Sequence, residues 1–281
     1  MRDGKTSNGA PDLSVAITVS GSAEYLRGCL GSIAENFCGF EYEIIVVDNG
    51  TPGGEASAAA ESAGVAVIRN ETNRGASAAR NQGIAAARGR YILILDDDTK
   101  FLNSGMAEML RFMDSRPDIG IAGAQLVDGG GAVQLTCRTL PGIREVLLRR
   151  LSGALPFVKK LPSYKRHHLT ALGHSRRLDV PMTISAFHLL RREAAERIGP
   201  LDERMFVYFE DIDYCARCRK AGYKVVYDPA VRVWHKERRE GGRGLFNPYT
   251  KHLVKSFFIY YFKNRKDIRR INRECPGGEL V

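Results

Sequence analysis

Apolar runs and helical patterns alternate along the first half of the chain. The runs are almost continuously aliphatic, which is typical of strands buried on both faces of a parallel sheet. They read LSVAITV (13–19), YEIIVVD (42–48), VAVIRN (65–70), YILIL (91–95) and IGIAGAQLV (119–127). The segments between them predict helices over 23–36, 55–64, 75–87 and 104–115. This order indicates an α/β fold of the nucleotide-binding type, with a mostly parallel central sheet and helices on both faces.

The second half of the chain is less regular. We expect a strand near Met182 to Leu190, a helix from Phe209 to Ala221, and two strands at YKVVYD (223–228) and AVRVWH (230–235). The sequence contains no internal repeat and no low-complexity linker, so we do not divide it into independently folding domains.

Carboxylates follow two of the predicted strands at the point where each strand ends. Asp48 ends the second strand, and Asp96, Asp97 and Asp98 follow the fourth. Ligands of open α/β sheets bind beyond the carboxyl ends of the strands. If strand geometry continues through the triplet, Asp96 and Asp98 point to one side and Asp97 to the other.

An Asp-x-Asp pair on one side of a strand end is a hard-oxygen site of the kind that Mg²⁺ or Mn²⁺ prefers. Such ions take their remaining ligands from waters and substrate phosphates. A metal bound together with a diphosphate would therefore compensate the adjacent negative charges of the aspartates. The structural alternative is that the aspartates only end the strand and cap the helix that begins near Ser104. Three carboxylates behind one buried strand favour the metal site.

The net charge of +10 is concentrated in two basic segments. Residues 138–177 hold ten lysines and arginines against one glutamate, and residues 236–274 hold twelve against four acidic residues. Their expected target is anionic: nucleotide phosphates, a membrane surface or nucleic acid.

Composition and cysteine usage indicate an ordinary globular protein, with 44% apolar and 26% charged residues. Its six cysteines are irregularly spaced and do not resemble a disulfide framework, and the C-x-x-C of Cys215 and Cys218 has no second pair to complete a zinc site. The polar N-terminus has no apolar core of a signal peptide, and FFIYYF (257–262) is too short to span a bilayer. These features predict a cytoplasmic protein.

Three segments together resemble the GT-A family 2 glycosyltransferases, and most closely their rhamnosyltransferase-like branch. They are EIIVVDNGT, NRGASAARNQGIAAARGRYILILDDDT and IGPLDERMFVYFEDIDYCARCRKAGYKVVYDPAVRVWH, in the order and spacing of that family. The resemblance covers roughly 13–235. It implies a flexible tail over 1–11 and a GT-A domain over 12–240, with a nucleotide-sugar half (12–128) and an acceptor half (129–240).

The resemblance also implies roles for individual residues of the donor site. It makes Asp98 the ligand of a divalent metal, Mg²⁺ or Mn²⁺, with His235 completing the metal shell. A histidine at a strand end is as often structural, so both interpretations of His235 stay open. The residues expected to bind the nucleotide-sugar are Asp48 at the nucleoside, Arg80 near the base and phosphate, Asp96 near the ribose or sugar, and Asp97.

The expected catalytic base lies among the acidic residues at the start of the helix after Phe209. The resemblance makes Asp211 the base, whereas the structural alternative leaves Glu210 and Asp211 as ordinary residues of a helix's first turn. Asp213 and Arg217 are four residues apart on this helix, and we expect them to pair on its surface.

The sequence departs from the family pattern at three places. Family members commonly carry Thr-Tyr-Asn where this chain has Val19, Ser20 and Gly21. The identity of the nucleotide base of the donor therefore stays open. Gly53 replaces the aspartate of a turn after Asp48, and a common Gly-Ala pair in the acceptor half is Ser185–Ala186 here.

The basic and aromatic segment 241–281 predicts a C-terminal helical extension. Its apolar residues fall near helical spacing, and its lysines and arginines suit reversible contact with an anionic membrane at the inner face. Packing of the segment on the catalytic domain is the alternative, and both hold if the aromatics dock inward and the lysines face outward.

The sequence thus predicts a metal-dependent, inverting glycosyltransferase that moves a sugar from a nucleotide-diphosphate sugar to a hydroxyl of a glycan, lipid-linked intermediate or natural product. The resemblance makes dTDP-rhamnose a candidate donor. Another metal-dependent nucleotide enzyme, such as a nucleotidyltransferase, is the first alternative. A nucleic-acid-binding protein is the second, but the chain lacks an aromatic-interleaved basic motif, and that function leaves the acidic triplet unexplained.

Overall fold

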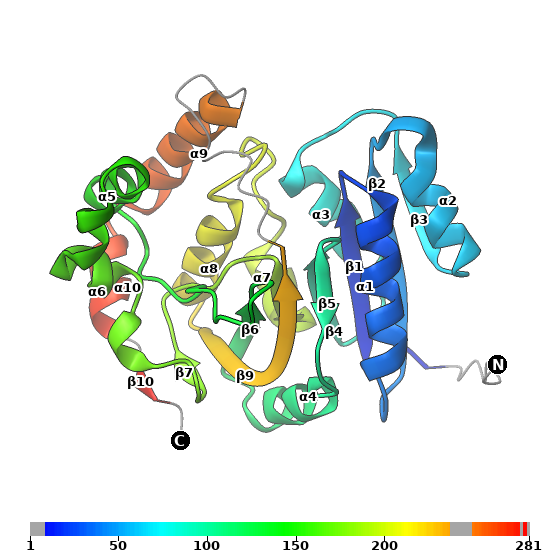
Figure 1. The fold of residues 1–281 in the computed structure, drawn as a ribbon. Helices are drawn as coiled ribbons and strands as arrows, with labels where there is room; N and C mark the ends of the chain where they lie inside the picture. Colours follow the sequence, from blue (N-terminus) through cyan, green and yellow to red (C-terminus); the bar gives the residue numbers. More distant parts are fainter. Residues whose placement is uncertain (1–8, 237–248, 276–277, 280–281) are drawn as a thin grey trace.

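The computed structural model describes residues 9–236, 249–275 and 278–279, and within them the strands form a single ten-stranded sheet (Figure 1). The strands are β1 (Leu13–Val19), β2 (Tyr42–Asn49), β3 (Ala66–Asn70), β4 (Tyr91–Asp96), β5 (Thr99–Phe101), β6 (Ile119–Val127), β7 (Leu178–Asp179), β8 (Phe187–Arg191), β9 (Lys224–His235) and β10 (Gly278–Glu279). Their order is β10-β7-β9-β6-β8-β4-β1-β2-β3, and β5 pairs with β9 outside this path.

Helices cover both faces of this sheet (Figure 1). They are α1 (Ala23–Asn36), α2 (Glu55–Ser62), α3 (Ala76–Ala86), α4 (Met106–Ser115), α5 (Ile143–Ala154), α6 (Pro162–His167), α7 (Arg192–Ile198), α8 (Glu210–Lys220), α9 (Tyr249–Asn264) and α10 (Ile268–Glu274). The cluster on one face includes side chains of α1, α2 and α4, and the cluster on the other includes side chains of α8, α9 and α10.

Strand β4 shows why the sheet is buried on both sides. Leu93 and Leu95 belong to the cluster on one face, and Ile92 and Ile94 belong to the cluster on the other. Successive side chains of a strand point to opposite faces, so a continuous aliphatic run supplies both clusters. The predicted two-faced sheet is confirmed.

Strands β1 to β4 are parallel, as predicted for the first half of the chain, and their register brings two carboxylates to one edge. Strand β1 lies between β2 and β4 and runs parallel to both. Val19 is paired with Asp48 of β2, and Thr18 is paired with Asp96 of β4. The two aspartates therefore end the two strands that flank β1.

The remaining strands extend the same sheet and include antiparallel pairs. Strand β8 is antiparallel to β4 and β6, while β6 and β9 are parallel. The two strands predicted over 223–235 are one strand, β9, with a register shift after Asp228. Pro229 lies within this irregularity, where its missing N–H costs no regular ladder bond.

The helices after position 248 pack against α8. The ring of Phe209 stacks on Tyr260 with centroids 5.5 Å apart, and Ser256 donates a hydrogen bond to the carbonyl of Val207. Asp213 is fully buried here, because Lys263 and Asn264 of α9 cover its carboxylate. The predicted pair of Asp213 with Arg217 exists at 2.9 Å, but the prediction that it lies on the surface is wrong.

Several sequence predictions fall partly outside the described residues. The predicted flexible tail does so over 1–8, and the C-terminal segment does so over 241–248, 276–277 and 280–281. Among the helices that the structure describes, none combines the length and the hydropathy that a bilayer-crossing segment needs. Cys215 and Cys218 are free thiols that lie buried on α8.

Candidate active site

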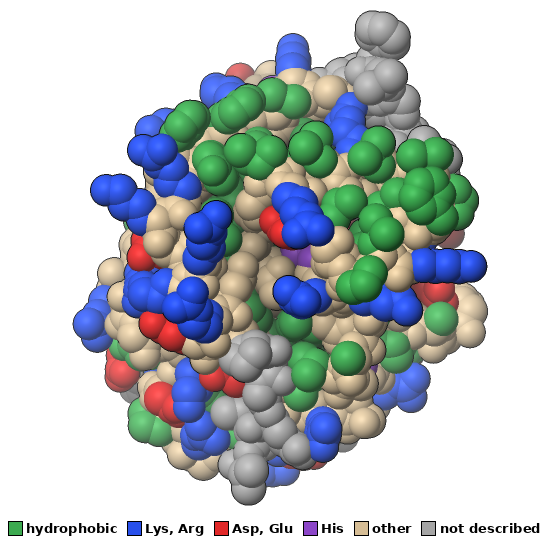
Figure 2. Space-filling view, turned by 90° about the vertical axis from the view of Figure 1, so that its left-hand side faces the viewer, with side chains coloured by type: hydrophobic (Ala, Val, Ile, Leu, Met, Phe, Trp, Pro, Cys, Tyr) green, Lys and Arg blue, Asp and Glu red, His purple; other side chains and the backbone are tan. Residues whose placement is uncertain are grey.

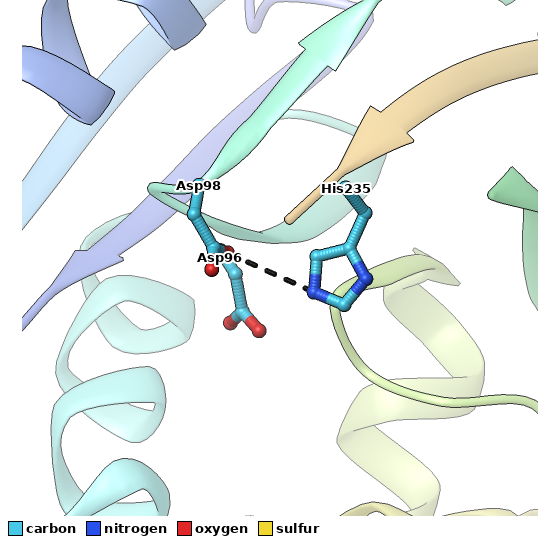
Figure 3. Close-up of side chains that lie close together, drawn as sticks. All are labelled: Asp96, Asp98 and His235. Carbon is cyan, nitrogen blue, oxygen red and sulfur yellow. Dashed lines mark ion pairs between the residues drawn. The ribbon is translucent and has the colours of Figure 1, made fainter. Parts of the chain in front are cut away.

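Asp96, Asp98 and His235 converge at the edge of the sheet where β4 ends (Figure 3). One ligand atom from each of the three side chains lies within 4.8 Å of the other two. The strand ends at Asp96, and Asp97 and Asp98 form a turn into β5, so the expected strand alternation does not continue through the triplet. The turn nevertheless brings the carboxylates of Asp96 and Asp98 together, as predicted.

Pairing of β5 with β9 brings His235 to the acidic turn from a distant part of the sequence. Thr99, which follows Asp98, is the register partner of His235. The imidazole Nε2 lies 3.7 Å from Asp98 Oδ1, and both side chains are buried. A single strand register thus explains why a histidine at the end of β9 faces the aspartates.

Gln134 fixes the orientation of the His235 ring. The amide Nε2 of Gln134 donates to the backbone carbonyl of His235 over 2.8 Å, which leaves the amide oxygen as acceptor for the ring Nδ1, also 2.8 Å away. Nδ1 therefore carries the proton, and Nε2 presents its lone pair toward Asp98.

The donor set of the three residues fits a divalent cation. Two carboxylates suit Mg²⁺, and an imidazole nitrogen added to them suits Mn²⁺. An imidazole whose second nitrogen is held by an outer partner is the usual arrangement of a metal-ligating histidine. Asp98 is 5% exposed, and burial of a carboxylate favours a site that supplies a positive counter-charge.

Arg80 connects this cluster to the start of α8. Its guanidinium donates to Asp96 Oδ1 over 2.8 Å and to Glu210 Oε1 over 2.7 Å. Burial alone would lower the pKa of Arg80, but Asp96 and Glu210 outweigh burial and raise the pKa above its usual value. Arg80 is 7% exposed, so it acts here as a buried bridge between two elements.

Glu210 and Asp211 occupy the first turn of α8, as predicted. The pKa of Glu210 is raised to about 7, mainly by burial and to a smaller extent by the nearby negative charge of Asp211. The positive charge of Arg80 opposes this shift. Asp211 is partly exposed, and its Oδ1 accepts from the backbone N–H of Ile212 over 2.8 Å. Of the two carboxylates, Asp211 is the one that solvent or a ligand reaches.

The backbone before α8 is held in an unusual conformation. Tyr208 and Phe209 have φ angles of 66° and 68°, in the left-handed region that non-glycine residues seldom adopt. Two such residues in succession cost free energy that surrounding packing must supply, and they cluster at functional sites. Here they place the acidic turn of α8 beside Arg80.

The loop before α8 docks on the start of α3, the helix that carries Arg80. The backbone N–H of Ala76 donates to the carbonyl of Phe206 over 2.7 Å, and the Ser77 hydroxyl donates to Met205. Gly75 permits this approach: its φ is 88°, and a Cβ there would lie 2.6 Å from the Phe206 carbonyl oxygen.

Asp48 lies at the same sheet edge but is already fully engaged. Its oxygens accept hydrogen bonds from the backbone N–H and the hydroxyl of both Thr51 and Ser57, over 2.5 to 3.2 Å. Burial would raise the pKa of Asp48, but these hydrogen bonds lower it below its usual value. The carboxylate therefore stays ionised and holds the loop that follows β2.

Sequence reasoning missed two residues of this site, Gln134 and His188, and it did not predict that Glu210 is buried. Burial lowers the pKa of His188 to about 4, against the nearby charges of Asp211 and Asp96, so its imidazole is neutral. Its Nε2 lies 3.0 Å from the Thr183 carbonyl, which it meets as a donor. A histidine among the apolar residues of FHLL (187–190) was the signal that could have identified it.

Comparison with known proteins agrees with this architecture. Residues 14–199 match the family "Glycosyl transferase family 2", so the chain belongs to glycosyltransferase family 2. Relatives include an uncharacterized protein y4gI of Sinorhizobium fredii (26% identity; 83% of this chain and 25% of the relative). The N-acetylglucosaminyl-diphospho-decaprenol L-rhamnosyltransferase of Mycobacterium tuberculosis shares 26% identity (77% and 73%), and the dTDP-rhamnosyl transferase RfbF of Shigella flexneri shares 23% (79% and 67%). The chain therefore spans a quarter of the length of y4gI.

Solved structures show the GT-A fold that the sequence predicts. GalNAc-T7 with UDP, GalNAc and Mn²⁺ superposes with a TM-score of 0.64 at 15% identity, over 94% of this chain and 50% of that one. The mannosyltransferase PcManGT from Pyrobaculum calidifontis, with GDP-Man and Mn²⁺, gives a TM-score of 0.55 at 16% identity, over 95% and 74%.

Proposed function

We propose that this protein is a metal-dependent inverting glycosyltransferase that moves a sugar from a nucleotide-diphosphate donor to an acceptor hydroxyl. The observation that carries the proposal is the convergence of Asp96, Asp98 and His235 at the carboxyl edge of the parallel strands. In open α/β sheets this edge is where ligands bind. Membership of glycosyltransferase family 2 supports the same reaction class and disfavours a nucleotidyltransferase or a nucleic-acid-binding protein.

The donor would lie against the acidic turn. Asp98 and His235 would hold Mg²⁺ or Mn²⁺, with Asp96 beside them, and the metal would neutralise charge on the departing diphosphate. Arg80 would orient Asp96 through their hydrogen bond. Asp48 would shape the nucleoside side of the site through the loop that it holds, and Asp97 would contribute negative charge at the same turn.

Asp211 would serve as the catalytic base. It would take the proton of the acceptor hydroxyl as that oxygen bonds to the anomeric carbon. The bond from the anomeric carbon to the diphosphate breaks, and its electron pair leaves with the nucleoside diphosphate. One displacement of this kind inverts the anomeric centre, and it needs no nucleophile from the enzyme.

The transferred sugar is proposed from the relatives. Two relatives are named as rhamnosyltransferases, and one of these names contains dTDP, so dTDP-rhamnose is our first candidate donor. Val19, Ser20 and Gly21 differ from the common family pattern, so other nucleotides belong in the same test. The acceptor would be a hydroxyl of a glycan, a lipid-linked intermediate or a natural product.

The inner side of the C-terminal helices packs against the rest of the protein. Lys263, expected to face an anionic membrane, lies 2.8 Å from Asp202 and 2.9 Å from Asp213 instead. Arg265 and Lys266 are exposed and remain candidates for peripheral contact.

A thermal-shift panel tests the proposed function directly. Nucleoside diphosphates and their sugars would be added with Mn²⁺ and with EDTA, and we expect stabilisation by one nucleotide that needs the metal. Stabilisation by no nucleotide diphosphate under either condition would contradict the proposal.

A further inference from the structure

Two exposed apolar stripes lie on α5 and α9, on one side of the molecule. Within each helix their residues are spaced four apart, so each stripe follows one face. They are Ile143, Leu147 and Leu151 on α5, and Val254, Phe258 and Phe262 on α9. The exposed fractions reach 57% at Leu147 and 62% at Phe262, and the exposed Leu155 and Phe157 extend the α5 stripe.

The two helices are neighbours, so the stripes contribute to one surface. Figure 1 shows α5 beside α9, and Figure 2 shows hydrophobic side chains gathered across the upper part of that face. Val146 of α5 packs against the same cluster as Phe257 and Tyr260 of α9. Burial raises the pKa of Tyr260 on α9, and the negative charge of Glu145 on α5 adds to that shift. Glu145 is therefore near Tyr260.

The stripes are separate from the faces that hold the helices in place. Ser256, Phe257, Tyr260 and Asn264 form the buried face of α9, and the exposed stripe lies outside it. Soluble monomers seldom leave so many large apolar side chains together in water, and such patches mark interaction sites.

The two chain segments that carry these stripes are strongly basic. Residues 143–166 contain seven lysines and arginines and one acidic residue, Glu145, and residues 249–266 contain five basic residues and no acidic one. Lys263 is used in internal ion pairs, but the other basic residues of both segments are exposed: Arg144, Arg149, Arg150, Lys159, Lys160, Lys165, Arg166, Lys251, Lys255, Arg265 and Lys266.

We propose that the α5–α9 surface docks on an anionic lipid membrane. Leucine and phenylalanine side chains enter the headgroup region, while the surrounding arginines and lysines meet lipid phosphates. A second copy of the chain would bring two positive surfaces together, which disfavours self-association. Nucleic acid would engage the positive charge but would leave the apolar stripes in water.

The docking has a consequence that rests on the proposed function. Helix α9 packs on α8, whose first turn carries Asp211, so a membrane under α5 and α9 lies on the acceptor side of the site. Among the proposed acceptors, this geometry favours a lipid-linked one.

Vesicle co-sedimentation of the full chain tests the docking independently of catalysis. Phosphatidylglycerol/phosphatidylcholine vesicles are compared with phosphatidylcholine alone, for wild type and for the combined variant Leu147→Gln/Leu151→Gln/Phe258→Gln. These side chains are exposed, so the variant should fold, and its stabilisation by nucleotide and Mn²⁺ should equal that of wild type. The matched control is Leu102→Gln, at a leucine that is 50% exposed and lies between β5 and α4.

We expect wild type and Leu102→Gln to bind the anionic vesicles and the triple variant to bind at least about tenfold more weakly. Binding should also weaken when salt rises from roughly 0.1 to 0.5 M. Equal binding of the triple variant and wild type, or no binding by wild type, would overturn the proposal. A dimer in sedimentation equilibrium that the triple variant dissociates would assign the surface to a second copy instead. If nucleotide and Mn²⁺ do not stabilise the wild-type protein although it binds the vesicles, the result counts against the proposed function and not against the docking.

Discussion

The guanidinium of Arg80 donates a hydrogen bond of 2.7 Å to Glu210, a residue 130 positions further along the chain. Through its other terminal nitrogen Arg80 holds Asp96, 2.8 Å away, beside the metal ligand candidates. One buried side chain therefore fixes the distance between Asp96 at the end of β4 and the helix turn that carries Asp211. Its removal should affect both the stability of the fold and the geometry of catalysis.

We expect Arg80→Met to destabilise the protein by about 3 to 5 kcal/mol. The substitution leaves Asp96 and Glu210 without their shared cation, and breaking a buried ion pair from one side costs free energy on this scale. Arg80→Lys should rescue only in part, because an ammonium cannot bridge both carboxylates as the planar guanidinium does. Urea unfolding followed by circular dichroism measures the change.

Arg88→Met is the control, because Arg88 pairs with Glu43 in a largely exposed position. It should shift the urea midpoint only slightly. Equal shifts for the Arg80 and Arg88 variants would contradict the bridging role of Arg80.

Glu210 should make stability depend on pH between about 4.5 and 7. Burial raises its pKa in the folded state to about 7, so the folded protein keeps a proton that the unfolded chain releases near 4.5. This stabilising contribution is complete below pH 4.5 and is lost as the pH rises toward 7. Glu210→Gln cannot titrate, so the stability of wild type relative to this variant should fall over that interval by up to about 3 kcal/mol.

Urea titrations of both proteins in EDTA, at several pH values, measure that difference. A difference that stays constant from about pH 4.5 to 7 would show that Glu210 is ionised throughout in the fold.

Gln134→Leu should weaken Mn²⁺ binding by about 10- to 100-fold, because His235 loses the partner that fixes its tautomer and ring orientation. Titration of the free Mn²⁺ signal by electron paramagnetic resonance measures the affinity without any substrate. Gln125→Leu is the matched control, since Gln125 donates to the backbone carbonyl of His174 and to the Tyr227 hydroxyl instead of contacting His235. If Gln134→Leu binds Mn²⁺ like wild type, the contact with Gln134 does not position His235 for the metal.

The first half of the fold could be predicted because its pattern is local. Strand β4 and helix α1 follow from aliphatic runs and helical spacing, and the helix predicted over 23–36 is Ala23–Asn36. The carboxylates at strand ends were visible for the same reason. Strand β9 was split in the prediction because Pro229 reads as a break, whereas the sheet absorbs it as an irregularity.

What the sequence could not predict depends on contacts between distant segments. Arg80 meets Glu210 only because the loop at Phe206 docks on α3, and no periodicity encodes that docking. Asp213 looked like half of a surface pair with Arg217, but α9 returns to cover it. A helical pattern predicts which side of a helix is exposed, but that prediction fails where another element packs on that side.

Asp211→Asn should lower the rate of sugar transfer by about 10² or more while leaving donor affinity nearly unchanged. The amide keeps the size of the side chain but cannot accept the acceptor proton. Transfer and donor binding are measured on the same preparation. Transfer near the wild-type rate would leave Asp211 as a helix-start residue and make Glu210 the next candidate, because the carboxylate of Asp213 is enclosed by Arg217, Lys263 and Asn264.

The central claim is that the acidic turn and His235 bind the donor through a divalent cation, and calorimetry of donor binding tests it most directly. The nucleotide that gives the largest thermal shift is titrated into wild type with Mn²⁺, into wild type with EDTA, and into Asp98→Ala with Mn²⁺. We expect tight binding only in the first case, because buried Asp98 lies 3.7 Å from His235 and the two would ligate the same ion. Equal donor affinity in EDTA and in Mn²⁺, or an Asp98→Ala variant that binds donor as wild type does, would contradict the account.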